Sequence, residues 1–157
     1  MSMLQAAVTL LGAVGAAMVL SGPVMAIQGV RGRARIGREL RDQGISFPGR
    51  GVPASLAGRP VVTGPQARDF AEVIGNNVRT ATGGRTYAQV SAELMAAPDG
   101  DDKLTALRQT AFTGQMLRAT LLNAYQAWQV TTLVIGLGTL LTATGVALIA
   151  AGIALAP

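Results

Sequence analysis

Two long apolar runs flank a polar middle segment in this sequence. The first run, from about Met3 to Ile27, and the second, within 119–157, contain no charged residue. The 13 basic and 8 acidic side chains all lie between Arg31 and Arg118. Each run is long enough to cross a bilayer, which takes about 20 helical residues at 1.5 Å per residue. The pattern predicts an all-α integral membrane hairpin, with two transmembrane helices and a small helical polar domain between them.

Shifts in composition divide the chain into five segments. The first transmembrane helix occupies 1–30 and a basic juxtamembrane segment follows at 31–43. A Gly/Pro-rich linker covers 44–65, where helical periodicity disappears, so we expect it to be irregular and extended. The small helical polar domain covers 66–118. The second transmembrane helix, with an interfacial lead-in, covers 119–157.

Capping residues predict where the helices of the polar domain begin. Thr63 is an expected N-cap, with Pro65 in the first turn, for a helix of about 66–80. Thr86 and Gln89 have the spacing of a capping box for a helix that reaches about Ala97. Pro98-Asp99-Gly100 is the predicted break after it.

The longest predicted helix begins at an aspartate cap, Asp101 or Asp102. No helix breaker follows between Lys103 and Gly136. We therefore expect one continuous helix that leaves the polar domain and enters the membrane.

The first apolar run could instead be a signal peptide, because Val24-Met25-Ala26 resembles a small-residue cleavage site. A signal peptide carries a positive region before its apolar core, and none precedes this run. The run is therefore interpreted as an uncleaved anchor. A kink is expected near Pro23.

Glycines recur every seven residues within both apolar runs. A seven-residue repeat keeps small residues on one face of a helix, and small residues let two helix backbones approach closely in lipid. We expect these stripes to be helix–helix contacts, within the hairpin or with another subunit. Their members are Gly15, Gly22 and Gly29 in the first run, and Gly138, Gly145 and Gly152 in the second.

Tyr125 and Trp128 lie where the polar domain meets the second span, the position that amphipathic aromatic side chains prefer. The alternative, a place in the core of the polar domain, is about equally plausible for Tyr125 and less so for Trp128.

Composition supports a membrane protein, because 13% of the residues are charged and about a quarter are charged in soluble domains. The net charge of +5 comes mainly from a basic cluster after the first span. The cluster has no aromatic residue on which bases could stack, so it predicts contact with lipid headgroups and not with nucleic acid. Its members are Arg31, Arg33, Arg35, Arg38 and Arg41.

The same arginines predict topology. By the positive-inside rule the middle domain lies in the cytoplasm and both termini lie outside, in a multi-pass protein of the plasma membrane. The rule weakens for loops longer than about 60 residues, and this middle segment is longer.

No residue pattern indicates catalysis, a metal or a cofactor. The chain has neither Cys nor His, which excludes thiol nucleophiles and the usual zinc and haem ligands. Asp99, Asp101 and Asp102 lack the pattern of an EF-hand and are interpreted as a capping turn. Thr82 to Thr86 has glycines ahead of a helix, a geometry that can bind anions, but it lacks the phosphate-loop ending and is interpreted as a connector.

Five short stretches of the middle segment carry a resemblance to other proteins: Ile45 to Pro48, Leu56 to Val61, Thr82 to Ala88, Arg108 to Phe112, and Leu117 to Tyr125. They resemble a group of small, uncharacterised actinobacterial membrane proteins with two predicted spans, in which the same short motifs occur in this order. The match covers roughly 40–125. The resemblance implies a shared fold and no activity. Members tend to begin with basic residues before the first span, and this chain has none there.

We therefore expect a non-catalytic membrane subunit that anchors, stabilises or assembles a larger complex, a respiratory or other redox enzyme being one candidate. Its expected partners are membrane lipids and other subunits or copies of itself. The alternative is a homo-oligomeric pore or small-molecule conduit lined by threonines such as Thr131 and Thr142. Such pores usually carry a charged or carbonyl ring, and neither is present here. The spans also lack the ionisable residues that mark proton relays.

Overall fold

A computed structural model describes residues 3–97 and 101–156 of the chain. The fold is all-helical, as predicted, and the described residues form no strand. Four helices follow one another: α1 (Met3–Asp42), α2 (Gly64–Ala81), α3 (Tyr87–Ala96) and α4 (Asp102–Leu155). The helices α1 and α4 are each long and apolar enough to cross a membrane. The predicted break at Pro98, Asp99 and Gly100 lies outside the described residues.

The helix boundaries follow the predicted caps. The Thr63 hydroxyl accepts a hydrogen bond from the Gln66 amide, and Pro65 lies in the first turn of α2. The capping box of α3 is present in full, with the Thr86 and Gln89 side chains bonded to each other's backbone amides. The Asp101 carboxylate accepts from the Leu104 amide at 3.0 Å, so Asp101 caps α4. These caps satisfy amides that have no partner inside a helix.

Both long helices are continuous. One helix, α1, runs through Pro23 and through the segments predicted separately as 1–30 and 31–43. The other, α4, runs without a break from the polar domain to Leu155, as expected from the absence of breakers.

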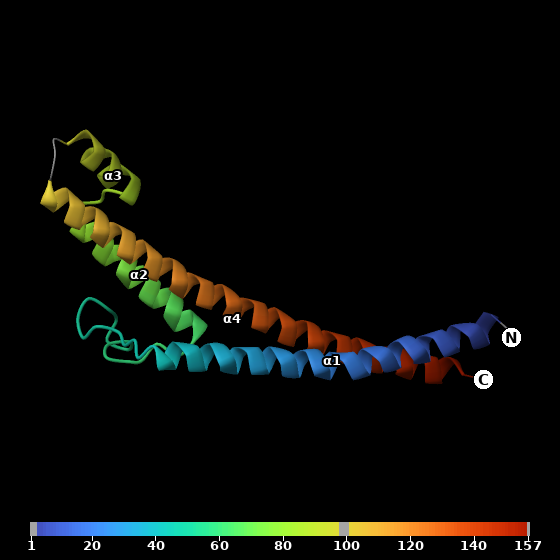
Figure 1. Ribbon diagram of the computed structural model, residues 1–157. Helices are drawn as coiled ribbons and strands as arrows, with labels where there is room; N and C mark the ends of the chain where they lie inside the picture. The colour runs from blue at the N-terminus through green and yellow to red at the C-terminus, as the bar shows by residue number, and fades with distance from the viewer. Residues whose placement is uncertain (1–2, 98–100, 157) are drawn as a thin grey trace. The chain divides into compact units, whose positions relative to one another are not determined.

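The chain divides into two compact units, and α1 and α4 contribute to both. Unit 1 consists of Met1–Arg35 and Trp128–Pro157, and unit 2 consists of Ile36–Ala127. In unit 1 the blue part of α1 and the red part of α4 lie side by side and run antiparallel (Figure 1). In unit 2, α2 packs against the first half of α4.

The Gly/Pro-rich segment 44–65 is folded, and the prediction of an extended linker was wrong. Ser46 and Pro60 form an antiparallel bridge. The Phe47 amide donates to the Arg59 carbonyl at 2.9 Å, and the Val61 amide donates to the Ile45 carbonyl at 2.9 Å. Gly58 has a φ of 70°, a left-handed conformation that favours glycine and lets the chain turn back toward Phe47. The prolines and glycines therefore build a closed loop.

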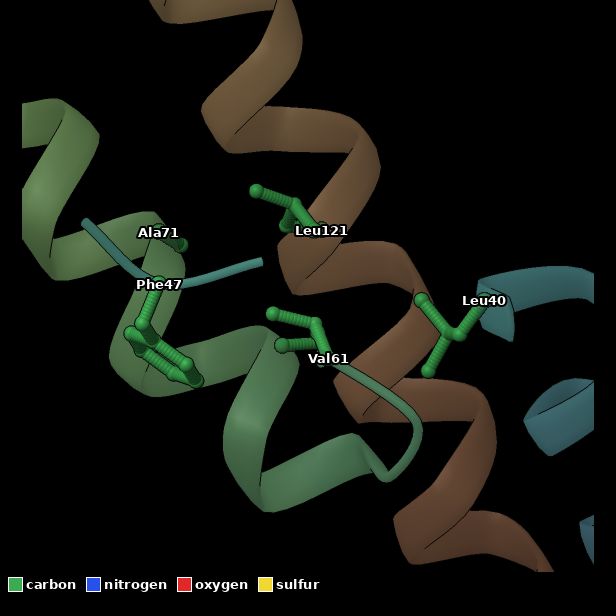
Figure 2. Packing of buried hydrophobic residues seen from close by; sticks show 6 residues of the cluster. Leu40, Phe47, Val61, Ala71 and Leu121 are labelled. Carbon is green, nitrogen blue, oxygen red and sulfur yellow. The ribbon is translucent and has the colours of Figure 1, made fainter. Parts of the chain in front are cut away.

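This loop brings two side chains into the core of unit 2. Phe47 and Val61 are buried beside Leu121 from α4 and Leu40 from the end of α1, and Figure 2 shows their convergence. The Phe47 and Phe70 rings meet edge to face at 5.4 Å. Burying each large apolar side chain stabilises the unit by about 1.5–3 kcal/mol. The full cluster is Leu40, Phe47, Val61, Ala67, Ala71 and Leu121.

Candidate functional site

The glycine positions singled out in the sequence lie at the contact between α1 and α4 in unit 1. A Cβ atom built on Gly145 would lie 2.6 Å from the Gly15 carbonyl oxygen, and one on Gly138 would lie 2.5 Å from the Gly22 carbonyl oxygen. Real Cβ atoms do not approach backbone atoms so closely. The two backbones can therefore meet at these positions only because the side chains are hydrogen.

The contact loosens toward one end. A Cβ on Gly29 would lie 2.6 Å from the Ile135 side chain, but one on Gly152 would have nothing closer than 3.6 Å. That is ordinary van der Waals distance. A Cβ on Gly136 would meet nothing within 4 Å, so Gly136 lies off this contact.

Burial in unit 1 is confined to this stripe. Among its described residues the buried ones are the six glycines and Thr131. Thr131 lies seven residues before Gly138 and so continues the α4 stripe toward the polar domain. Only 11% of the most apolar window of each long helix is buried. Many large apolar side chains of unit 1 are exposed, such as Leu20, Leu133 and Leu140, while Ile135 and Ile149 flank the glycine contact.

Arg33 differs from the other arginines of the basic cluster. Its guanidinium donates to the Thr132 hydroxyl at 2.5 Å and to the Thr131 hydroxyl at 3.4 Å. It also lies 4.9 Å from the centre of the Trp128 ring, a cation–π distance. Arg31, Arg35, Arg38 and Arg41 are exposed. The sequence-based prediction treated the five arginines alike. Helical spacing at 3.6 residues per turn nevertheless places Arg33 on the opposite side of α1 from Arg31, Arg35 and Arg38.

Of the two predicted interfacial aromatics, Trp128 belongs to unit 1 and Tyr125 to unit 2. The Arg68 guanidinium lies 5.8 Å from the Tyr125 ring centre. A hydrogen bond to the Tyr125 side chain, together with the nearby Glu72 carboxylate, raises the pKa of Arg68 above its usual value. Tyr125 thus contributes to the polar domain, the alternative left open in the sequence.

The turn between α2 and α3 satisfies its own polar groups. The buried Thr82 hydroxyl donates to the Arg85 carbonyl at 2.7 Å, and the Arg85 guanidinium donates to the Thr82 carbonyl at 2.9 Å. The Gln89 side chain accepts from the Thr86 amide. These bonds occupy the donors that an anion would need, which favours the connector interpretation over an anion loop.

The two glutamates considered in the sequence are partly exposed and paired with arginines. Glu93 accepts from Arg85 at 2.6 Å, and Glu72 lies 3.5 Å from Arg68. The described residues contain no group of three or more potential metal ligands, and Asp99 lies outside them. Each of these two glutamates therefore lies beside an arginine.

The threonines of the second span bond to their own helix. Thr131 and Thr132 both donate to the Trp128 carbonyl, and Thr142 donates to the Gly138 carbonyl at 2.9 Å. A Thr142 atom is also the nearest neighbour of a Cβ built on Gly22, so this hydroxyl lies at the α1 contact.

Two cavities flank the contact between α2 and α4 in unit 2, and sequence reasoning missed both. One, of about 460 Å³, is lined mostly by apolar atoms around Ile74, Val78 and Gly114. The other, of about 260 Å³, is polar and has Arg79 and Arg118 in its wall. Helical spacing alone does not show which residues of two helices will meet.

Comparisons of the chain with protein-family models, with curated protein sequences and with solved structures find no match.

Proposed function

We propose that this chain is a non-catalytic integral membrane protein that serves as an anchoring or assembly subunit, alone or within a larger complex. The observation that carries the proposal is the inverted burial in unit 1. The buried positions are mostly glycine, and many of the large apolar side chains are exposed. Water would penalise such an outer surface, and hydrocarbon would not.

The lengths of the two apolar segments support a membrane-spanning hairpin. The uncharged part of α1 from Met3 to Val30 is about 42 Å long at 1.5 Å per residue, longer than the roughly 30 Å of hydrocarbon. Arg33, Trp128, Thr131 and Thr132 cluster at one end of this apolar region. Trp and Arg are the side chains expected at the headgroup level.

A second face of α4 supports association with further helices. Six exposed residues without a large side chain fall within about 80° of the circumference, away from the glycine contact, at 3.6 residues per turn. Gly136 on this face has nothing within 4 Å. Small residues let a further helix approach closely, which is how helices associate in lipid. The residues are Gly136, Thr139, Ala143, Ala147, Ala150 and Ala154.

The corresponding far side of α1 carries the exposed side chains of Leu20, Val24 and Ile27. The proposal therefore assigns lipid contact to α1 and further helix contact to α4. The conduit alternative gains no specific support, because the hydroxyls of Thr131 and Thr142 bond to their own helix and lie at the α1 contact.

Membrane insertion is tested by alkaline carbonate extraction, which should leave the protein in the pellet. Topology is tested with Ser55→Cys, because Ser55 is exposed in the middle domain and the chain has no other Cys. With the middle domain in the cytoplasm, the thiol reacts with an impermeant maleimide only after cells are opened. Release by carbonate would contradict integral insertion, and labelling of intact cells would reverse the topology.

Assembly is tested by cross-linking mass spectrometry and by co-purification of differently tagged copies in a mild detergent. Ala143→Leu on the small face should lower recovery of partners several-fold. Ala151→Leu is the matched control, because it is the same change on the leucine-rich side of α4. Recovery of a lone monomer with no reproducible cross-link would contradict the assembly role.

A further inference from the structure

Two glycines shape the contact between α2 and α4 in unit 2. A Cβ built on Gly114 would collide with the Val78 side chain, so α2 lies close to α4 at this point. Gly75 on α2 faces Arg118 on α4, and a Cβ there would lie 3.3 Å from the Arg118 Nε. The absence of a side chain at Gly75 lets the Arg118 side chain lie flat against α2.

Arg118 has no anionic partner in the part of the chain that the structure describes. Its Nε is buried against α2 without a hydrogen bond. The ion pairs among the described residues use Arg68 and Arg85 instead. A half-buried guanidinium without a counter-charge is unfavourable, because its charge loses hydration and gains nothing in exchange.

A second guanidinium lies in the wall of the same cavity. Arg79 and Arg118 line a polar cavity of about 260 Å³ together with Glu72, Gly75 and Asn76. Arg79 donates to the Asn76 side-chain oxygen, which holds it at the cavity wall and leaves the Asn76 amide nitrogen as a further donor. The only carboxylate in the wall, Glu72, is already paired with Arg68. The cavity therefore has an excess of positive charge and of hydrogen-bond donors.

We propose that this cavity binds a small oxyanion of the phosphate or carboxylate type. The planar fork of a guanidinium matches such anions in two parallel hydrogen bonds, and two arginines with one amide supply donors from different sides. The volume of about 260 Å³ lies below the roughly 300–1,000 Å³ of pockets for drug-sized ligands, so a small anion fits it better. The ligand contacts are the outer guanidinium nitrogens, since the Arg118 Nε faces α2.

The competing explanation is that Glu72 itself neutralises the two arginines. The two explanations predict opposite effects of Glu72→Gln. If the cavity takes an external oxyanion, removing this negative charge tightens binding. If Glu72 is the internal counter-ion, the wild-type chain shows no saturable binding and the same change destabilises unit 2.

The test uses the full chain in a non-ionic detergent, titrated by calorimetry with inorganic phosphate and separately with succinate. Chloride at matched ionic strength is the blank. We expect saturable binding of at least one anion, and competition between them distinguishes a phosphate site from a carboxylate site. Arg118→Gln and Arg79→Gln should each weaken binding by at least about tenfold, the size expected for losing a charged hydrogen bond of about 1.4 kcal/mol or more. Glu72→Gln should strengthen it.

Arg108→Gln is the matched control, because Arg108 lies on the same helix, is exposed and does not line the cavity. It should change affinity by less than about twofold, the effect of screened net charge alone. An equal loss with Arg108→Gln, or no saturable binding by the wild-type chain, would overturn the proposal.

Arg118→Lys keeps the positive charge but loses the paired donors of the planar guanidinium. This variant should bind the anion more weakly than the wild-type chain and more tightly than Arg118→Gln. If Arg118→Gln does not retain helical circular dichroism, Arg79→Gln and Arg118→Lys decide the result. This site does not depend on the assembly role, because the titration is made on detergent-solubilised chains. Its failure would leave that role unaffected.

Discussion

The two units of this chain bury opposite kinds of residue. In unit 2 the buried side chains are mainly apolar and include Phe47, Val61 and Leu121, with Thr82 as a buried polar one. In unit 1 they are glycines and one threonine, and exposed residues include Leu20, Leu133 and Leu140. The first arrangement is stable in water because it removes apolar surface from it. The arrangement in unit 1 gains little from removing apolar surface from water. It depends on close packing of the two helix backbones, as helix association does in lipid.

The difference shows that hydropathy alone does not report what holds each half together. In unit 2 the stabilising atoms are side-chain carbons, so shortening a side chain leaves a cavity. In unit 1 the close contacts involve backbone atoms, so adding a side chain pushes the helices apart. Shortening a leucine should therefore cost stability in the core of unit 2 and have little effect at an outward position of unit 1.

The largest expected effect is the loss of a core leucine in unit 2. Leu121→Ala should lower the free energy of unfolding of this unit by about 2–5 kcal/mol, because it opens a cavity beside Phe47 and Val61. Leu140→Ala, an outward position of unit 1, should leave it unchanged. Hydrogen exchange of the α2 amides is the measurement, and equal protection in the two variants would remove the distinction between the units.

The next effect is the addition of a side chain to the glycine contact. Gly138→Leu should separate α1 from α4, since even a Cβ there would lie 2.5 Å from a backbone oxygen. We expect a loss of about 1–3 kcal/mol from overpacking. The assay is disulfide formation between Leu11→Cys and Gly152→Cys, whose Cβ atoms would lie 3.6 Å apart, within the disulfide range.

Gly136→Leu is the control for this experiment, because Gly136 faces away from α1 with nothing within 4 Å. It should preserve the intramolecular disulfide and reduce only the association between chains. If both variants abolished the disulfide equally, the stripe would not be the contact.

Alanine substitutions sharpen the comparison within the stripe itself. Gly145→Ala should weaken the helix contact by about 1 kcal/mol, because its Cβ would press on the Gly15 carbonyl. Gly152→Ala should be neutral, since its Cβ would find ordinary contact distances. Thermal unfolding in detergent, followed by circular dichroism, should rank the two variants in this order. The reverse ranking would mean that the contact is tightest at the other end.

The smallest effect concerns a helix cap in unit 2. Thr86→Ala should destabilise α3 by about 1 kcal/mol, because it removes half of the capping box. Thr105→Ala, an exposed position within α4, is the matched control and should change stability by less than about 0.5 kcal/mol. Hydrogen exchange of the Gln89 amide reports the cap directly, and unchanged exchange would mean that the cap contributes nothing.

Local rules predicted much of this fold. The caps at Thr63, Thr86 and Asp101 could be predicted from the sequence because capping involves only residues within one helical turn. The continuity of α4 followed from the absence of breakers, and the seven-residue spacing of Gly138 and Gly145 placed them on one helix face. Each of these inferences needs only neighbouring residues.

The parts that sequence did not reveal involve residues far apart along the chain. The loop at 44–65 was predicted to be a linker because its sequence, rich in proline and glycine, shows no helical or strand periodicity. In the structure Ser46 pairs with Pro60, and Phe47 and Val61 are buried. Arg33 and Thr132 are almost one hundred positions apart, and only packing of α1 on α4 brings them together.

The sequence by itself determined the helical class, the helix starts and the two uncharged segments, because periodicity, capping and charge placement are local properties. Only the tertiary structure decided which glycines need to remain glycine, which arginine turns inward, and that Arg79 and Arg118 line one cavity. Those outcomes depend on the distance between two helices. No residue pattern within a single helix specifies that distance, because it is set by the side chains of both partners at once.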